Sequence, residues 1–232
     1  MATELELNLI RRIAMGDILR RRARDRGSRE AIVEFSGGER RALTFAEFNA
    51  RVNQWVRGLR ARGLRQGDRV ALLGGNTSEF LIALWGCFKG GFVAVPINFL
   101  QNADDVGYNI HHSGARAAFA DDRLHALVDS VTADLGELVR GTLAGAGSER
   151  YPAFAAVLAG QDAAEVEDIV IDDDDLAQIM YTSGTTARPK GVMLSHKNLF
   201  LSSLNLVLSI GSNKNSTSHP AVLPLFHITA MM

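Results

Sequence analysis

The most informative stretch of this sequence is Tyr181-Thr182-Ser183-Gly184-Thr185-Thr186-Ala187-Arg188-Pro189-Lys190-Gly191-Val192. Seven of its twelve residues are Ser, Thr, Gly or Lys, and the apolar segment from Leu176 to Met180 leads directly into it. A strand that ends in such a loop presents backbone N–H groups, hydroxyls and an ammonium to a common point, and these are the groups that hold a polyphosphate. Because Pro189 disfavours helix at the residue before it, we expect Lys190 to lie outside a helical turn.

Two simpler interpretations of this stretch are an ordinary solvated turn and a Walker A loop. Turns rich in Gly, Ser and Thr are common, and a Walker A loop ends in Gly-Lys-Ser/Thr, whereas here Lys190 precedes Gly191. The ordered string instead resembles the phosphate-binding signature of the adenylate-forming enzymes, Tyr/Phe-Thr-Ser-Gly-Ser/Thr-Thr-Gly-x-Pro-Lys-Gly. This superfamily comprises acyl-CoA ligases, peptide-synthetase adenylation domains and beetle luciferases. The sequence departs from the signature at Ala187, which replaces a glycine and bears on the affinity for ATP.

Composition and charge are those of an ordinary globular protein. The chain has 232 residues, of which 47% are hydrophobic and 22% charged, and its net charge of −1 does not favour nucleic acid as a partner. The single cysteine, Cys87, lies in an apolar segment and is expected to be a small buried hydrophobic residue. A chain with one cysteine cannot form an internal disulfide, which fits a reducing compartment, and we expect the cytoplasm. We expect neither a secretory signal nor a transmembrane segment, because the apolar runs are too short.

The N-terminal segment is rich in arginine. Leucine and isoleucine recur near helical spacing over residues 6–25, which predicts a helix. Acidic residues interrupt the basic ones, so we expect a solvated helix face, with contact to anionic lipid as the alternative. The arginines concerned are Arg11, Arg12, Arg20, Arg21, Arg22, Arg24 and Arg26.

Strands and helices alternate through the middle of the chain. The expected elements are a hairpin over 31–35 and 42–43, a helix from a Thr44–Glu47 capping box to Gly63, a strand at 70–73, a helix capped by Asn76 or Thr77 and closed by Gly90-Gly91, a strand at 92–96, a helix at 103–112 and a strand at 115–120. A strand, helix and strand of this spacing form a parallel, right-handed βαβ unit. The sequence therefore predicts an α/β fold in which helices cover a mainly parallel sheet.

The later part of the chain is less informative. Residues 135–160 predict only a short helix near 151–158, and a helix capped by Ser195 is expected to continue to Leu208. Asp172 to Asp175 are expected to form a solvated loop, since four consecutive carboxylates cannot all converge on one metal ion. Four of the histidines, His111, His112, His125 and His219, lack a spacing that suggests metal binding.

Further segments extend the resemblance to the adenylate-forming enzymes from about residue 30 to the end of the chain. Phe92-Val93-Ala94-Val95-Pro96-Ile97-Asn98 is similar to an N-terminal landmark of the family, and Leu223-Pro224-Leu225-Phe226-His227-Ile228-Thr229-Ala230 to its next motif. In the family, the aromatic-His pair of that motif stands beside the acyl substrate. A histidine on an apolar stretch is otherwise more often a core residue, but both motifs together favour His227 as a residue that lines the acyl and thioester site. We interpret His196 as structural.

The resemblance implies a fold, a reaction and a set of site residues. The chain would be the N-terminal part of the family's large domain, with an α/β part over 1–175 and a phosphate-loop and acyl-site part over 176–232. The complete enzyme would use ATP and Mg²⁺ to convert a carboxylic acid into an acyl-adenylate, and then coenzyme A to form the acyl-CoA. Lys190 and His227 would be catalytic, and Thr185 would be a metal ligand. The implied triphosphate ligands are Thr182, Ser183, Gly184, Thr185, Thr186 and Lys190.

Several parts of the family's sequence have no counterpart here. Family members are more than twice as long, and their Tyr-Gly-x-Thr-Glu segment and small C-terminal domain, with its catalytic lysine, are absent. We therefore expect an N-terminal fragment that is inactive alone. The form Phe226-His227-Ile228-Thr229-Ala230 is more similar to fatty-acyl or carnitine-type CoA ligases than to peptide-synthetase domains. The alternatives are an adenylation domain that loads a carrier protein, and a non-catalytic remnant that binds ATP or an acyl group.

Overall fold

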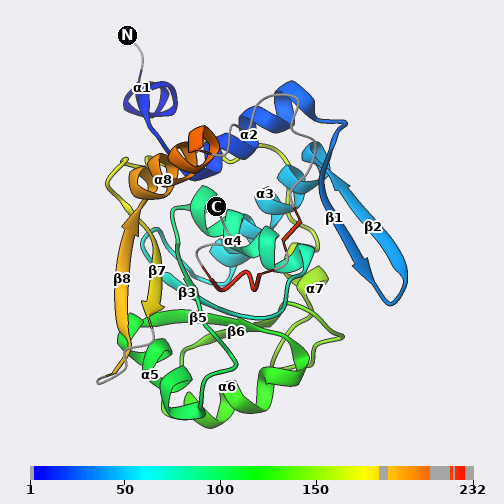
Figure 1. Cartoon of the computed structure of the whole chain (residues 1–232), viewed down its shortest axis with the longest axis vertical. Coiled ribbons are helices and arrows are strands. Elements are labelled where there is room, and N and C mark those ends of the chain that lie inside the picture. Colours follow the sequence, from blue (N-terminus) through cyan, green and yellow to red (C-terminus); the bar gives the residue numbers. More distant parts are fainter. Residues whose placement is uncertain (1–2, 183–187, 210–219, 222, 228–232) are drawn as a thin grey trace.

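The computed structural model describes residues 3–182, 188–209, 220–221 and 223–227. Its centre is a six-stranded sheet of order β6-β5-β3-β4-β7-β8 (Figure 1). The strands are β3 (Arg69–Leu73), β4 (Val93–Pro96), β5 (Ala115–Ala120), β6 (Val139–Thr142), β7 (Leu176–Thr182) and β8 (Lys190–Ser195). All neighbours pair in parallel except β7 and β8, which are antiparallel. The predicted α/β class with a mainly parallel sheet is confirmed.

Helices cover both faces of this sheet (Figure 1). Val70 and Leu72 of β3 belong to the hydrophobic cluster that includes α3 (Phe45–Ala61) and α4 (Ser78–Gly90). Ala71 and Leu73 belong to the cluster on the opposite face, which includes α5 (Ala103–Ser113) and α6 (His125–Val131). Successive residues of a strand point to opposite faces. β3 and β4 therefore read as nearly continuous apolar runs because both of their faces are buried.

Most of the predicted elements in the first half of the chain are confirmed, and their starts and ends follow local sequence signals. The hairpin of β1 (Glu30–Ser36) and β2 (Glu39–Thr44) is confirmed, as is the capping box at the start of α3, where Glu47 N–H donates to Thr44. Of the two candidate caps of α4, Thr77 is the one that accepts from the helix, at 3.2 Å from the Phe80 nitrogen. That helix ends at Gly91, whose φ of 68° is left-handed and therefore suits glycine.

The prediction of a single N-terminal helix over 6–25 is wrong. The chain forms α1 (Glu4–Arg11) and α2 (Met15–Arg26), separated by Arg12, whose backbone is extended. The physical reason is a buried ion pair, in which the Arg12 guanidinium donates to both carboxylate oxygens of Asp17, at 2.7 and 2.9 Å, and to the Ile169 carbonyl at 2.8 Å. The expectation of a solvated arginine face is likewise wrong for Arg12, which is only 6% exposed.

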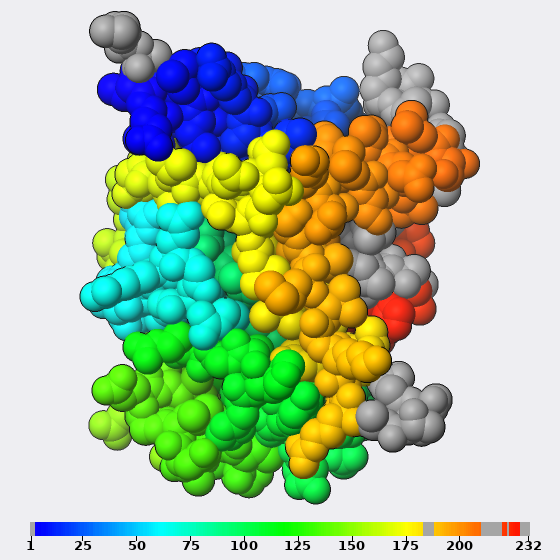
Figure 2. Space-filling view, turned by 90° about the vertical axis from the view of Figure 1, so that its left-hand side faces the viewer, coloured from blue at the N-terminus to red at the C-terminus, as the bar shows by residue number. Residues whose placement is uncertain are grey.

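The segment that leads into β7 lies directly beneath these N-terminal helices (Figure 2). Asn8 exchanges two hydrogen bonds with the backbone of Ile171, and the Ile13 N–H donates to the Asp173 carboxylate at 2.5 Å. The aspartate-rich loop is therefore tied to the N-terminus as well as solvated. The first two helices thus help to fix the strand that carries the candidate phosphate loop.

Other elements also differ from what the sequence indicated. The sequence did not predict α6, β6 or β8, and the helix near 151–158 is shorter than expected, α7 (Phe154–Leu158). Helix α8 (His196–Ser209) follows β8 directly and is capped by Ser195, as predicted, with the Asn198 N–H donating to the Ser195 hydroxyl. Cys87 is fully buried, as expected. Among the helices of the described residues, none combines the length and apolar character needed to cross a bilayer.

Candidate active site

The carboxyl ends of the parallel strands meet at one edge of the sheet. After β3 the chain turns to α4 on one face, and after β4 it turns to α5 on the other. Loops that diverge from neighbouring strands leave a crevice at the carboxyl edge, which is where open α/β sheets bind ligands. Strand β7 lies next to β4 and is parallel to it, so the candidate phosphate loop leaves the sheet at this same edge.

Strands β7 and β8 form the two sides of that loop. Thr182 pairs with Lys190 and Tyr181 with Gly191, so Lys190 begins a strand and lies outside a helical turn, as predicted. Thr182 and Lys190 are exposed, and Pro189 is buried. The remaining predicted ligands lie outside the described residues: Ser183, Gly184, Thr185 and Thr186, together with Ala187.

A cavity of about 270 Å³ lies beside this hairpin. The loop between β4 and α5, the end of β7 and the histidine motif each contribute to its wall. Its lining residues are Pro96, Asn98, Gln101, Met180, Tyr181, Thr182, Phe226 and His227. The structure thus brings two of the predicted site residues, Thr182 and His227, to the same cavity. Lys190 is not part of the lining but lies beside it through its pairing with Thr182.

An aromatic cluster supports both sides of the hairpin. The Tyr181 hydroxyl shares a hydrogen bond with Nδ1 of His112 at 2.9 Å, and the His112 ring stacks on Tyr108 with 4.9 Å between centroids. The guanidinium of Arg188 lies 5.0 Å from the centre of the Tyr108 ring, a cation–π contact. Burial and the neighbouring Tyr108 raise the pKa of Tyr181 to about 12, so its hydroxyl stays protonated at neutral pH. Tyr108 and His112, one turn apart on α5, hold both ends of the loop.

The histidine motif packs against the neighbouring strand ends. Phe226 is nearly buried and meets Phe99 edge to face, with 5.4 Å between ring centroids. Arg123 covers the Phe99 ring, with its guanidinium carbon 4.7 Å from the centroid. Phe226 is therefore a fixed wall of the cavity, and the exposed His227 follows it at the mouth.

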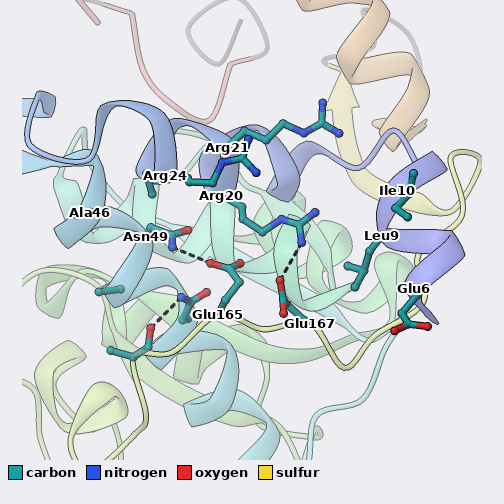
Figure 3. A pocket seen from close by; sticks show the side chains of 14 residues that line it. Glu6, Leu9, Ile10, Arg20, Arg21, Arg24, Ala46, Asn49, Glu165 and Glu167 are labelled. Atoms are coloured by element: carbon teal, nitrogen blue, oxygen red, sulfur yellow. Dashed lines mark hydrogen bonds and ion pairs between the residues drawn. The ribbon is translucent and has the colours of Figure 1, made fainter. Parts of the chain in front are cut away.

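A larger hollow, of about 810 Å³, lies far from the strand ends, among α1, α2, α3 and the segment 163–167 (Figure 3). Two of its carboxylates, Glu165 and Glu167, are paired with positively charged side chains. Figure 3 shows Arg20 directed at Glu167, at 3.1 Å, and Asn49 directed at Glu165, at 2.8 Å. Glu165 also pairs with Lys89, a buried ammonium that donates to the Asn49 side chain at 2.6 Å. This hollow is larger than the cavity beside the hairpin, but the paired side chains in its wall hold helices and the segment 163–167 together. We therefore do not assign it as the ligand site.

The buried His196 lines neither of these two hollows. His196 is 1% exposed, and its Nδ1 accepts from the Met15 N–H at 3.2 Å, which agrees with a structural role. Burial lowers the pKa of His196 to about 4. Among the described residues, no group of three or more His, Cys, Asp or Glu side chains is placed to hold a metal ion. Thr185, the predicted metal ligand, lies outside these residues.

Comparison with known proteins gives the family. The model of the AMP-binding enzyme family matches residues 19–232, nearly the whole chain. The chain belongs to the AMP-binding enzyme family. A feruloyl-CoA synthase from Amycolatopsis sp is 37% identical over 193 residues, which are 82% of this chain and 35% of that protein. The predicted resemblance is therefore confirmed.

Other members of the AMP-binding family carry different acids and acceptors in their names. The long-chain-fatty-acid–CoA ligase FadD13 of Mycobacterium tuberculosis is 34% identical over 94% of this chain and 42% of its own length. A fatty acid–[acyl-carrier-protein] ligase, ScoC, of Streptomyces coeruleorubidus is 36% identical over 70% of this chain and 30% of its own. ATP-bound MatB from Rhodopseudomonas palustris superposes with a TM-score of 0.80 at 30% identity, covering 95% of this chain and 42% of that structure. The chain thus spans about a third to two fifths of these relatives.

Some site residues carry no signal in the sequence. Tyr108 and His112 lie on α5, about 70 residues before the hairpin that they support. Asn98 and Gln101 are polar residues in a loop, and their place in the cavity follows only from the position of β4 next to β7. The neighbouring landmark at 92–98 is the one local signal that pointed to this loop.

Proposed function

We propose that the complete enzyme that contains this chain is an acid–thiol ligase, which activates a carboxylic acid with ATP and transfers the acyl group to a thiol. The observation that carries the proposal is the register of the β7–β8 hairpin. It closes the candidate phosphate loop with the Thr182–Lys190 pair beside a cavity whose other wall is Phe226 and His227. A site for an anionic nucleotide tail and a site for an acyl group would thus share one edge of the sheet.

The reaction would take place in two steps. A carboxylate oxygen attacks the α-phosphorus of ATP, the bond from that phosphorus to the bridging oxygen breaks, and pyrophosphate leaves. A thiol sulfur then attacks the acyl carbonyl carbon, AMP leaves, and the thiol proton passes to solvent or a base. The first step brings two anions together, so preorganised positive charge at the phosphates is its main requirement.

Each described residue has a role in that proposal. Lys190 would place its ammonium against the phosphates, and Thr182 would donate its hydroxyl to them. Tyr181, kept protonated and held by His112, would fix the strand that delivers Thr182. Phe226 would form the apolar wall that orients the acyl group, and His227 would stand at the mouth, where the thiol has to approach the carbonyl.

Mg²⁺ is the remaining group that the family implies. Within this chain Thr185 would be its protein ligand, and the phosphates of ATP would supply further oxygen ligands. Bound there, it would neutralise part of the phosphate charge.

The acid and the acceptor are proposed from the relatives. We infer a fatty acid because the motif at 226–230 has the fatty-acyl form and FadD13 is named for long-chain fatty acids. We infer coenzyme A as the acceptor, since feruloyl-CoA synthase and FadD13 are both named for it. We place the enzyme in the cytoplasm, because the one cysteine of this chain, Cys87, is free and buried, which fits a reducing compartment.

The described chain would supply only part of this machinery. Residues 1–175 would act as the scaffold and 176–232 as the phosphate and acyl part, and the rest of the catalytic apparatus would correspond to the part of the relatives that this chain does not cover. The 232-residue chain alone is therefore expected to be inactive. Acid-dependent exchange of labelled pyrophosphate into ATP by this chain would contradict that expectation.

The test of the function uses the complete enzyme with a panel of fatty and aromatic acids. Acid-dependent pyrophosphate exchange, followed by mass-spectrometric detection of an acyl-CoA, is the expected result. Absence of exchange with every acid would refute the proposal. The name of ScoC favours one second candidate, a ligase that loads a carrier protein. Product formed with a carrier protein but not with coenzyme A would establish that function instead.

A further inference from the structure

The side chain of Asn76 connects the first parallel strand to the histidine motif. Asn76 lies in the loop between β3 and α4, where the neighbouring Thr77 already caps the helix. The Asn76 amide nitrogen donates to the Ala221 carbonyl at 3.1 Å and to the Leu223 carbonyl at 2.9 Å, and its oxygen accepts from the Leu225 N–H at 2.8 Å. This orientation of the amide is the one that satisfies all three partners. If the amide were reversed, its oxygen would face the two carbonyls and its NH₂ group would face the Leu225 N–H.

The three partners of Asn76 are alternate residues. One amide can bind all three because its nitrogen carries two donors and its oxygen is an acceptor. Beyond this point the segment turns, with the His227 N–H donating to the Pro224 carbonyl at 2.9 Å. The turn follows directly from the clamped stretch. It delivers Phe226 and His227 to the cavity at the carboxyl edge.

The clamp works together with contacts from the next two strand ends. Phe99, after β4, meets the Phe226 ring, and Arg123, after β5, covers Phe99. Phe99 and Arg123 act through side-chain contacts, whereas Asn76, after β3, binds the backbone of the motif. Three neighbouring strands of the sheet thus each contribute one side chain to the placement of a single short segment.

We propose that Asn76 is a positioning residue for the acyl site, which holds the 221–225 backbone so that Phe226 and His227 form the wall against the acyl group. This inference rests on the proposed function for its catalytic consequence, but the clamp itself can be tested without any reaction. Asn76 is exposed, so its replacement opens no cavity in the core. The variants are therefore expected to fold.

The first measurement is hydrogen exchange in the complete enzyme, comparing Asn76→Ala with the wild type. Loss of three hydrogen bonds should accelerate exchange in peptides that cover 220–227 by about tenfold or more, while peptides of β3 and β4 stay unchanged. Thr77→Ala is the matched control, because it removes the cap of α4 in the same loop but leaves the clamp. It should leave the exchange of 220–227 unchanged. Equal exchange of 220–227 in Asn76→Ala and the wild type would overturn the inference.

The second measurement separates positioning from general stability. Asn76→Ala should raise KM for the carboxylic acid about tenfold while KM for ATP stays within about twofold, since the loss falls on the acyl side. Asn76→Asp keeps the shape and one acceptor but turns an anionic oxygen towards two carbonyls, so it should not restore the KM for the acid. Equal rises in both KM values, or the same pattern in Thr77→Ala, would show a merely structural role and overturn the inference.

A wild-type enzyme without adenylation activity would refute the proposed function alone, and the exchange experiment would still decide whether the clamp exists.

Discussion

Two of the hollows among the described residues, the one between the N-terminal helices and the one at the carboxyl edge of the sheet, differ in more than volume. The larger one, among α1, α2 and α3, measures about 810 Å³, and two of its carboxylates, Glu167 and Glu165, are already paired with Arg20 and Lys89. The smaller one measures about 270 Å³, but it lies at the carboxyl edge beside the β7–β8 hairpin. The comparison shows that position in the fold and the chemistry at the rim identify a ligand site better than volume does. If it is correct, substitutions at the two places should affect different properties.

The largest expected effect is on activity at the smaller cavity. Lys190→Ala in the complete enzyme should slow adenylation by about 100- to 1000-fold, because a preorganised charge at the phosphates is lost. Its effect on the free energy of unfolding should stay below about 0.5 kcal/mol, since Lys190 is exposed. Pyrophosphate exchange and urea denaturation measure the rate of adenylation and the free energy of unfolding.

The matched control is Lys197→Ala, which removes another exposed lysine and should retain full activity. A parallel loss of stability and activity in Lys190→Ala would contradict the prediction.

At the larger hollow the expected effect is on stability. Lys89→Met should lower the free energy of unfolding by about 3 kcal/mol, because it leaves Glu165 and the side-chain oxygens of Asn49 and Asn53 without their buried cation. Burial lowers the pKa of Lys89, and the opposing charge of Glu165 limits that shift. Urea denaturation at pH 7 tests the prediction. KM for ATP should not change, and an increase in KM with unaltered stability would assign this hollow to the substrate.

The third prediction concerns pH and the buried His196. Its folded pKa of about 4 lies below the ordinary value of 6.5, so between these values the unfolded chain binds a proton that the folded chain excludes. Stability should therefore fall as pH is lowered from about 6.5 to about 4, by on the order of 2 to 3 kcal/mol from this residue. His196→Gln, which can still accept from Met15 N–H, should show a weaker decline in urea denaturation over this range. Identical pH profiles for the variant and the wild type would contradict it.

The smallest effect is expected at the rim of the larger hollow. Arg24 pairs with Asp25 at 3.0 Å, but both side chains are well exposed. Arg24→Ala should therefore change the free energy of unfolding by less than about 0.5 kcal/mol and leave adenylation unchanged. A stability loss as large as that of Lys89→Met would show that the rim charges, and not the buried network, hold the two N-terminal helices in place.

The elements that the sequence predicted have signals within their own residues. The Thr44–Glu47 capping box starts α3, and the apolar runs of β3 and β4 indicate buried parallel strands. Strand β6 contains only Val139–Thr142, with an arginine and a glycine, and it is a strand because it pairs with β5. The break between α1 and α2 depends on the Arg12–Asp17 pair and on Ile169, a contact across more than 150 residues. Such long-range causes leave no local pattern.

The residues of the candidate site likewise include some that the sequence predicted and others that it did not. Thr182, Lys190 and His227 follow from ordered motifs, and the structure places Thr182 and His227 on one cavity with Lys190 next to Thr182. His112 and Asn76 were not predicted in their present roles. Asn76 was a candidate helix cap, and its side chain instead crosses to residues 221–225. A cap motif identifies residues able to bind backbone but does not say which backbone they bind.

Hydrogen exchange of the complete enzyme with and without MgATP tests most directly whether the hairpin holds the nucleotide. Binding of the triphosphate to the loop should protect peptides that cover 176–195, while peptides that cover 1–26 and 161–167, around the larger hollow, should exchange as before. Protection confined to the larger hollow, with no change along β7 and β8, would contradict the assignment of the site.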